Sequence, residues 1–193
     1  MDRLIIATNN EHKLKELREI LKPYFKEIVS LREAGIQHET VEDASTFEGN
    51  ALKKAREIAA ISGCAALADD SGLTVSALNG EPGVYSARYA GEPCDDKKNL
   101  ELVLKKMEGQ INRAASFVCV LALVTPQKEL IARGEVAGEL TNSPQGAGGF
   151  GYDPIFYVPE YKCTFAQMTP EQKNSLSHRA LAAKNLAAEL EKL

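Results

Sequence analysis

No long apolar run and no excess of basic charge occur in the 193-residue sequence. A helix that spans a membrane needs about 20 consecutive apolar residues, so we expect no membrane span. The formal net charge of -4 argues against a broad surface for nucleic acid. The first residues also lack the apolar core of a signal peptide. We therefore expect a cytoplasmic protein that binds neither membranes nor nucleic acids.

Cysteine and histidine are scarce, with four and three residues respectively. The cysteines form no C-x-x-C pair and have no nearby histidines at ligand spacing, so neither a zinc site nor a disulfide framework is indicated. The remaining composition, 44% hydrophobic and 26% charged, is typical of a globular protein. A chain of this length can bury a sizeable core, and we expect one domain over residues 1–193.

The most informative stretch is residues 67–72, Leu-Ala-Asp-Asp-Ser-Gly. The small apolar residues 64–68 predict a buried strand, and two carboxylates follow directly. Side chains alternate between the two faces of a strand, so Asp69 and Asp70 cannot both point into one site if the chain stays extended. A carboxylate here can hold Mg²⁺ and orient a water. The same residue types also favour a simple turn, and these six residues alone leave both alternatives open.

Residues 3–7 are predicted to form a strand that leads through a polar turn into a helix. Leucines at helical spacing indicate the helix, with Asn10 as its N-cap. The N–H groups and dipole of a helix start favour phosphate, and Lys13 would add a positive charge. The segment matches no Walker loop, and a capped helix with a solvated lysine is the alternative.

A second helix is predicted from about residue 46 to 62, with Ser45 as N-cap, Glu48 completing a capping box and Gly63 at its end. Another is expected to begin at Asp95 or Asp96. A last helix is expected to follow the capping box at residues 169–172 and to run to about Leu190. The other expected strands are residues 28–31, 73–78, 117–124 and 129–136. This succession predicts an α/β fold.

Two segments near the C-terminus carry further candidate site residues. Four glycines within residues 146–151 allow a ligand to approach the backbone, and Phe150 and Tyr152 offer rings on which a base can stack. A plain flexible loop would explain these glycines but not the aromatic residues. Lys173, His178 and Arg179 place three donors near a helix start, although a solvated basic face is the commoner explanation.

Together these segments resemble the inosine triphosphate pyrophosphatase family, whose members hydrolyse deaminated purine nucleoside triphosphates. The resemblance covers essentially the whole chain and depends on six short motifs in the same order. The motifs are Thr8-Asn9-Asn10-x-x-Lys13, Phe47 with Asn50-Ala51-x-x-Lys54-Ala55, Ala68-Asp69-Asp70-Ser71-Gly72, residues 82–88, residues 149–154, and Lys173 with Ser177-His178-Arg179.

This resemblance implies an α/β fold with an elongated mixed β-sheet flanked by helices and two lobes around a central cleft. It also implies a homodimer, Mg²⁺ as cofactor, and hydrolysis of ITP, dITP or XTP to the monophosphate and pyrophosphate. It assigns Asp70 as the catalytic base, and Glu42 and Asp70 as metal ligands, with Glu39 as the alternative to Glu42. The substrate-binding residues that it implies are Thr8, Asn9, Asn10, Glu11, His12, Lys13, Lys54, Ser71, Phe150, Gly151, Tyr152, Asp153, Lys173, His178 and Arg179.

Three other functions remain open on the sequence. A nucleotide-binding regulatory module would keep Lys13, Phe150 and His178 but would not need paired carboxylates. An RNA-binding protein would use residues 173–179, against which the acidic net charge argues. A pyrophosphatase of the related Maf type would act on pyrimidine or modified nucleotides.

Overall fold

The computed structural model describes residues 3–192, except for the side chain of His12. Its strands form one seven-stranded sheet in the order β2-β1-β3-β4-β5-β6-β7. The strands are β1 Arg3–Ile6, β2 Glu27–Ser30, β3 Ala65–Val75, β4 Ala114–Val124, β5 Glu129–Leu140, β6 Phe156–Val158 and β7 Cys163–Thr164. The α-helices are α1 Glu11–Leu21, α2 Phe47–Ser62, α3 Asp96–Lys106, α4 Pro170–Leu176 and α5 His178–Leu190. Short 3₁₀ turns lie at η1 Ser76–Leu78, η2 Gly83–Arg88, η3 Asp153–Ile155 and η4 Phe165–Gln167.

The sheet mixes parallel and antiparallel pairing. β1 is parallel to both β2 and β3, whereas β6 is antiparallel to β5 and to β7. A mixed sheet combined with helices confirms the predicted α/β class.

The chain divides into two compact units. Unit 1 comprises Met1–Asp70, Cys119–Gly134 and His178–Leu193, and unit 2 comprises Ser71–Val118 and Glu135–Ser177. The expectations of one domain over residues 1–193 and of two lobes around a cleft stay predictions.

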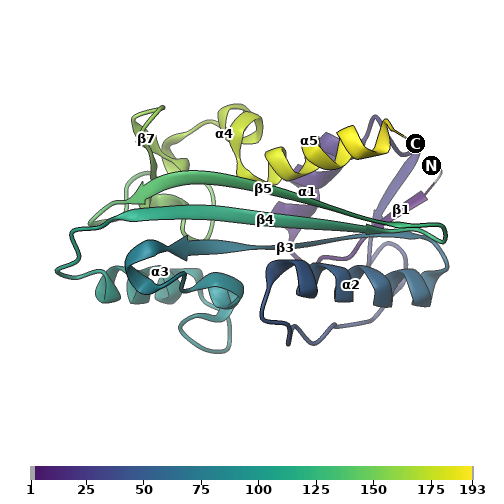
Figure 1. Cartoon of the computed structure of the whole chain (residues 1–193), viewed down its shortest axis with the longest axis horizontal. Helices are drawn as coiled ribbons and strands as arrows, with labels where there is room; N and C mark the ends of the chain where they lie inside the picture. The colour runs from purple at the N-terminus through teal and green to yellow at the C-terminus, as the bar shows by residue number, and fades with distance from the viewer. Residues whose placement is uncertain (1–2, 193) are drawn as a thin grey trace. The chain divides into compact units, whose positions relative to one another are not determined.

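In unit 1, α1 and α5 cover one face of the sheet and α2 covers the other (Figure 1). Leu67 of β3 belongs to the core on the α1 and α5 side. Because side chains alternate along a strand, Asp69 lies on that same face and Asp70 on the face of α2. Other members of this core are Leu4, Ile6, Leu14, Leu17, Leu21, Cys119, Leu121 and Leu186.

In unit 2, three phenylalanine rings form the centre of the core. The centroid of Phe117 lies 4.6 Å from that of Phe156 and 5.6 Å from that of Phe165. Apolar residues of α3 pack into the same core, together with Tyr152. The glycine-rich segment around Tyr152 is thus anchored by a ring inside the protein.

The turn that residues 69–72 suggest is absent, because β3 continues without interruption from Ala65 to Val75. The strands expected at residues 64–68 and 73–78 are therefore parts of one strand, which ends at Val75, and residues 76–78 form η1 instead. Gly72 has a packing reason, since a Cβ atom there would lie 2.3 Å from Ser86 Oγ and 2.5 Å from the Gly83 carbonyl oxygen. Gly72 is needed because η2 packs closely against β3 at this position. In the sequence, such a glycine cannot be distinguished from one that forms a turn.

Two helix predictions need correction. The N-cap of α2 is Thr46, whose hydroxyl accepts a hydrogen bond from the N–H of Gly49 at 3.1 Å, and not Ser45. Both residue types cap well, so the sequence could not separate them. The expected single C-terminal helix is two helices, because Ser177 has extended backbone with ψ 156°. Lys173 consequently lies in α4 of unit 2, and Arg179 lies in α5 of unit 1.

Candidate functional site

The segment between β1 and α1 has the predicted strand–turn–helix form. Thr8 Oγ1 accepts from the N–H of Asn10 at 3.2 Å, and Asn10 Oδ1 accepts from the N–H of Lys13 at 3.1 Å. Asn10 is therefore the helix cap, as predicted. Asn9 and Glu11 are exposed, whereas the side chain of His12 lies outside the described residues. A capped and largely exposed helix start can receive an anion.

Asp69 is a completely buried carboxylate that is held by two cations. Its Oδ1 forms a short ion pair with Lys13 Nζ, and its Oδ2 accepts from Arg179 Nε at 3.3 Å. Cys119 Sγ also donates to Oδ2, at 3.0 Å. Burial alone raises the pKa of Asp69, but the charges of Lys13 and Arg179 outweigh it and hold this pKa well below its usual range.

Arg179 is also buried, although it was expected to bind substrate. Its Nη1 forms a short ion pair with Glu16 of α1, while its Nε donates to Asp69. These contacts join β3, α1 and α5 through a chain of alternating charges within unit 1. Its neighbour His178 is buried as well, at the first position of α5.

Asp70 faces the opposite side of β3 and has different partners. Asn50 Nδ2 donates to Asp70 Oδ2 at 3.0 Å, and Lys54 Nζ lies 3.9 Å from Oδ1. Burial raises the pKa of Asp70 to about 6, with Glu42 acting in the same direction and Lys54 opposing it. A carboxyl group with this pKa is ionised near pH 7 and basic enough to take a proton from a water.

Glu42 lies beside Asp70, and both contact the same ammonium group. Lys54 Nζ donates to Glu42 Oε1 at 2.7 Å and to the backbone carbonyl of Asp69 at 2.7 Å. The pair fits Mg²⁺, because this cation typically takes one or two protein carboxylates and completes its shell with water and substrate phosphate. A complete protein cage is absent, since the described side chains include no group of three or more potential His, Cys, Asp or Glu ligands.

A second group of predicted residues comes together in unit 2. Asp153 Oδ2 accepts from Lys173 Nζ at 2.7 Å and from the N–H of Phe150 at 2.8 Å. Lys173 Nζ also lies 4.6 Å from the centroid of the Phe150 ring, a cation–π distance. Asp153 and Lys173 are both buried, and Phe150 is partly exposed.

Gly149 makes this arrangement possible. It has φ +72°, and a Cβ atom there would lie 2.1 Å from Asp153 Oδ2. A side chain at this position would therefore displace the carboxylate that holds Phe150 and Lys173.

Tyr152 is placed differently from Phe150. Its ring is buried, and its hydroxyl donates to the carbonyl oxygen of Ser86 at 2.7 Å. Of the two rings expected to stack on a base, only Phe150 is therefore partly open. The N–H of Gly151 donates to Asp96 Oδ2 at 2.9 Å, and Ser71 is partly exposed on β3.

Sequence reasoning left two residues out of the site. Asn50 belongs to one of the six motifs but was given no role in the site, and nothing in the sequence predicts its contact with Asp70. Glu16 looks like any charged residue on an amphipathic helix, and its pairing with Arg179 across 163 positions has no local signal.

Comparison with known proteins agrees with this arrangement of residues. The model of the Ham1 family matches residues 4–189. A dITP/XTP pyrophosphatase of Desulforamulus reducens is 50% identical over 99% of this chain and 96% of its own length. One of Bacillus subtilis is 46% identical over 99% of this chain and 98% of its own length.

Solved structures of Ham1 proteins share the fold of this chain. The Staphylococcus aureus Ham1 protein superposes with a TM-score of 0.91 at 42% identity, covering 98% of each chain. A HAM1 protein from Coxiella burnetii has the same score and identity and covers 100% of each chain. The resemblance that the six motifs indicated is thereby confirmed. This chain belongs to the Ham1 family.

Proposed function

We propose that this protein hydrolyses dITP, XTP and ITP to the nucleoside monophosphate and pyrophosphate, with Mg²⁺ as cofactor. The observation that carries the proposal is the separation of two adjacent carboxylates by one strand. Asp69 neutralises Lys13 and Arg179 on one face, while Asp70 stands beside Glu42 on the other with its pKa raised to about 6. The names of the similar proteins, dITP/XTP pyrophosphatase, support dITP and XTP as substrates.

Asp70 is proposed to act as the general base. It accepts a proton from a water, and that water attacks the α-phosphorus while pyrophosphate leaves. Asp70 and Glu42 would hold Mg²⁺, which would offset the charge of the phosphate groups when bound. Lys13, Lys54 and the start of α1 add positive charge for the triphosphate, whose displacement depends mainly on positioning and charge.

Lys173 is proposed to select the base. The expected substrate contacts of His178 and Arg179 stay predictions. An ammonium group only donates hydrogen bonds, and inosine and xanthine present an accepting keto oxygen at position 6. Adenine has an amino group there, which would set donor against donor at a buried site. An unmade buried hydrogen bond costs about 1–3 kcal/mol, which disfavours ATP.

A pyrophosphate-release screen over all common and deaminated nucleoside triphosphates tests the proposal. We expect rapid turnover of dITP, ITP and XTP with Mg²⁺, slow turnover of ATP, and loss of activity when the metal is removed with EDTA. Selective turnover of pyrimidine nucleotides would favour the Maf type of activity. Tight nucleotide binding without any turnover would favour a regulatory module.

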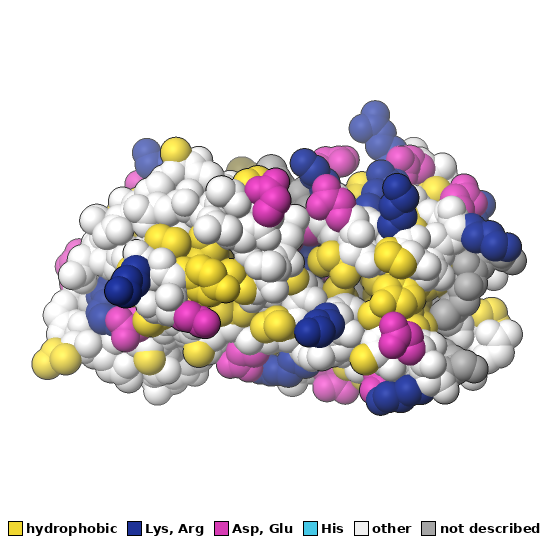
Figure 2. Space-filling model, turned by 90° about the horizontal axis from the view of Figure 1, so that it is seen from above, with side chains coloured by type: hydrophobic (Ala, Val, Ile, Leu, Met, Phe, Trp, Pro, Cys, Tyr) yellow, Lys and Arg dark blue, Asp and Glu magenta, His cyan; other side chains and the backbone are white. Residues whose placement is uncertain are grey.

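On the face drawn in Figure 2, basic and acidic side chains are intermingled, which supports a small-molecule substrate over a nucleic acid. No described helix combines the length and apolar character of a membrane span. We propose a homodimer in the cytoplasm, to be checked by sedimentation of the purified protein and by cell fractionation.

A further inference from the structure

Asn50 uses both ends of its side-chain amide at the candidate cation site. It is fully buried on α2, where its Nδ2 donates to Asp70 Oδ2 at 3.0 Å and its Oδ1 accepts from the N–H of Ala44 at 3.0 Å. Ala44 belongs to the Glu42 loop, which we define as residues 36–46. We propose that Asn50 is a positioning residue that fixes Asp70 and the Glu42 loop relative to each other and so builds the cation site. This inference rests on the proposed function.

The chemistry of its two partners leaves little choice of residue at position 50. A backbone N–H can only donate and an ionised carboxylate can only accept, so one short side chain must both accept and donate. Asparagine does so, and these partners also fix which end of its amide points to Asp70. Aspartate would place a second carboxylate against Asp70, and alanine would leave both partners without this contact.

Other side chains of α2 also contact the Glu42 loop, but they are charged, whereas Asn50 is neutral. They are Glu57 with His38 and Thr40, Lys53 with Asp43, and Lys54 with Glu42. Lys54 contacts both candidate ligands, but its positive charge opposes a bound cation and is suited to phosphate. Asn50 is neutral, so it holds Asp70 without repelling a metal ion. Partners that orient metal ligands in this way typically contribute about 10–100-fold to metal affinity.

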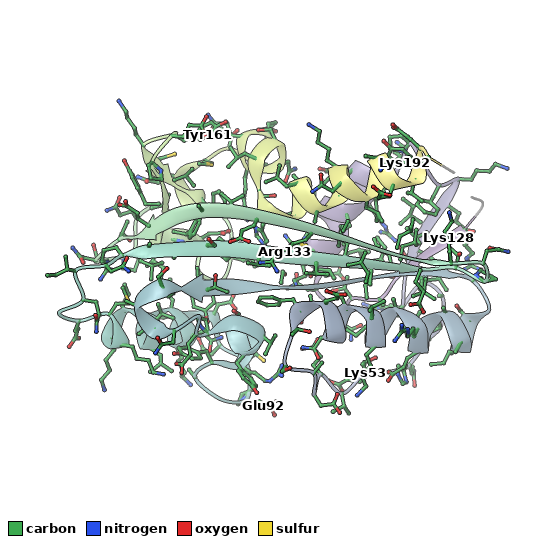
Figure 3. The ribbon with its side chains drawn as sticks, in the orientation of Figure 1. Lys53, Glu92, Lys128, Arg133, Tyr161 and Lys192 are labelled. Carbon is green, nitrogen blue, oxygen red and sulfur yellow. The ribbon has the colours of Figure 1, made fainter. Side chains whose placement is uncertain are left out.

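The test is direct binding of Mn²⁺ to the nucleotide-free protein, followed by electron paramagnetic resonance of the unbound ion. Mn²⁺ prefers the same oxygen ligands as Mg²⁺. We expect Asn50→Ala to weaken Mn²⁺ binding by about tenfold or more. Lys53→Ala is the matched control, because Lys53 lies on the side of α2 away from the sheet and pairs only with Asp43 among the loop contacts named above (Figure 3). It should bind Mn²⁺ like the unaltered protein.

Asn50→Ser guards against loss of folding in the alanine variant, since its hydroxyl can satisfy one of the two partners. It should weaken Mn²⁺ binding in the same direction while circular dichroism shows a folded protein. A folded serine or alanine variant that binds Mn²⁺ normally would overturn the role of Asn50, as would an unaltered protein that binds no Mn²⁺. Failure of the proposed function is a separate result, because it appears as absent pyrophosphate release by the unaltered protein.

Discussion

Asp69 and Asp70 are neighbours in the chain with opposite electrostatic surroundings. The cations Lys13 and Arg179 hold the pKa of Asp69 well below its usual range, against the opposing effect of burial. Burial raises the pKa of Asp70 to about 6, and Lys54 offsets only part of this effect. One carboxylate is therefore committed to buried ion pairs, and the other keeps enough basicity for proton transfer.

Asp70→Asn should lower kcat by roughly 10²–10⁴ or more, because it removes the proposed general base, whose catalysis alone contributes about that much, and also a proposed metal ligand. The measurement is steady-state pyrophosphate release from dITP at saturating Mg²⁺. Asp43→Asn is the control, since exposed Asp43 belongs to the same loop as Glu42 but pairs with Lys53. Near-normal turnover by the Asp70 variant would show that another group is the base.

Lys13→Ala should weaken binding of triphosphates more than binding of monophosphates. The ammonium group of Lys13 lies in the first turn of α1 and is partly exposed even while it pairs with Asp69. Calorimetric titration with both classes of nucleotide gives the two affinities, with exposed Lys15 on the same helix as the control in Lys15→Ala. If binding of triphosphates and monophosphates were weakened equally, Lys13 would not contact the outer phosphates.

Sequence reasoning located the candidate site better than it described the site's interior. Asp70, Lys54 and Glu42 do come together, because side chains of α2 contact both β3 and the loop that carries Glu42. The pairing of Asp69 with Lys13 and Arg179 was not predicted, since it depends on how α1 and α5 pack against β3. Nor was the burial of Tyr152, whose hydroxyl finds a partner 66 positions away.

Among the elements, β3 is a strand whose sequence at residues 69–72 is typical of a turn. Asp, Ser and Gly favour turns locally, but β3 is hydrogen-bonded between β1 and β4 in the sheet and is largely buried, which keeps residues 65–75 extended. Tertiary pairing thus overrides local propensity here. Because the strand stays extended, Asp69 and Asp70 point to opposite faces of the sheet.

The cap of α2 offers a test at the scale of the element. Thr46→Ala should lower the free energy of unfolding by about 1 kcal/mol, because it removes the acceptor for the N–H of Gly49. Ser45→Ala should change the stability much less, although the sequence pattern favoured Ser45 as the cap. Urea unfolding of both variants provides the comparison. A larger loss for Ser45→Ala would restore the original assignment.

At the scale of the whole molecule, the candidate site is a source of instability. A buried carboxyl group whose pKa is raised binds its proton more tightly in the folded chain than in the unfolded chain. Stability therefore decreases as pH rises from about 4 to about 6, and the loss persists above that range. A difference of about two pKa units corresponds to about 3 kcal/mol. Such a cost is typical of sites that trade stability for function.

In buffer that contains EDTA, loss of charge at Asp69 and at Asp70 should shift the stability of the protein in opposite directions. Asp70→Asn should raise Tm by several degrees at pH 7.5, because asparagine keeps an acceptor for Asn50 without a buried charge. This advantage should vanish near pH 4, where Asp70 of the unaltered protein is already protonated.

Asp69→Asn should do the reverse and lower Tm at pH 7.5, since buried Arg179 and Lys13 lose a charged partner. The pKa of Asp69 is lowered on folding, so its contribution is present above about pH 4 and is lost as the pH falls below that value. Differential scanning fluorimetry across this pH range gives both curves. If both variants lose stability equally at pH 7.5, the proposed division of labour across β3 is wrong, because opposite surroundings must give shifts of opposite sign.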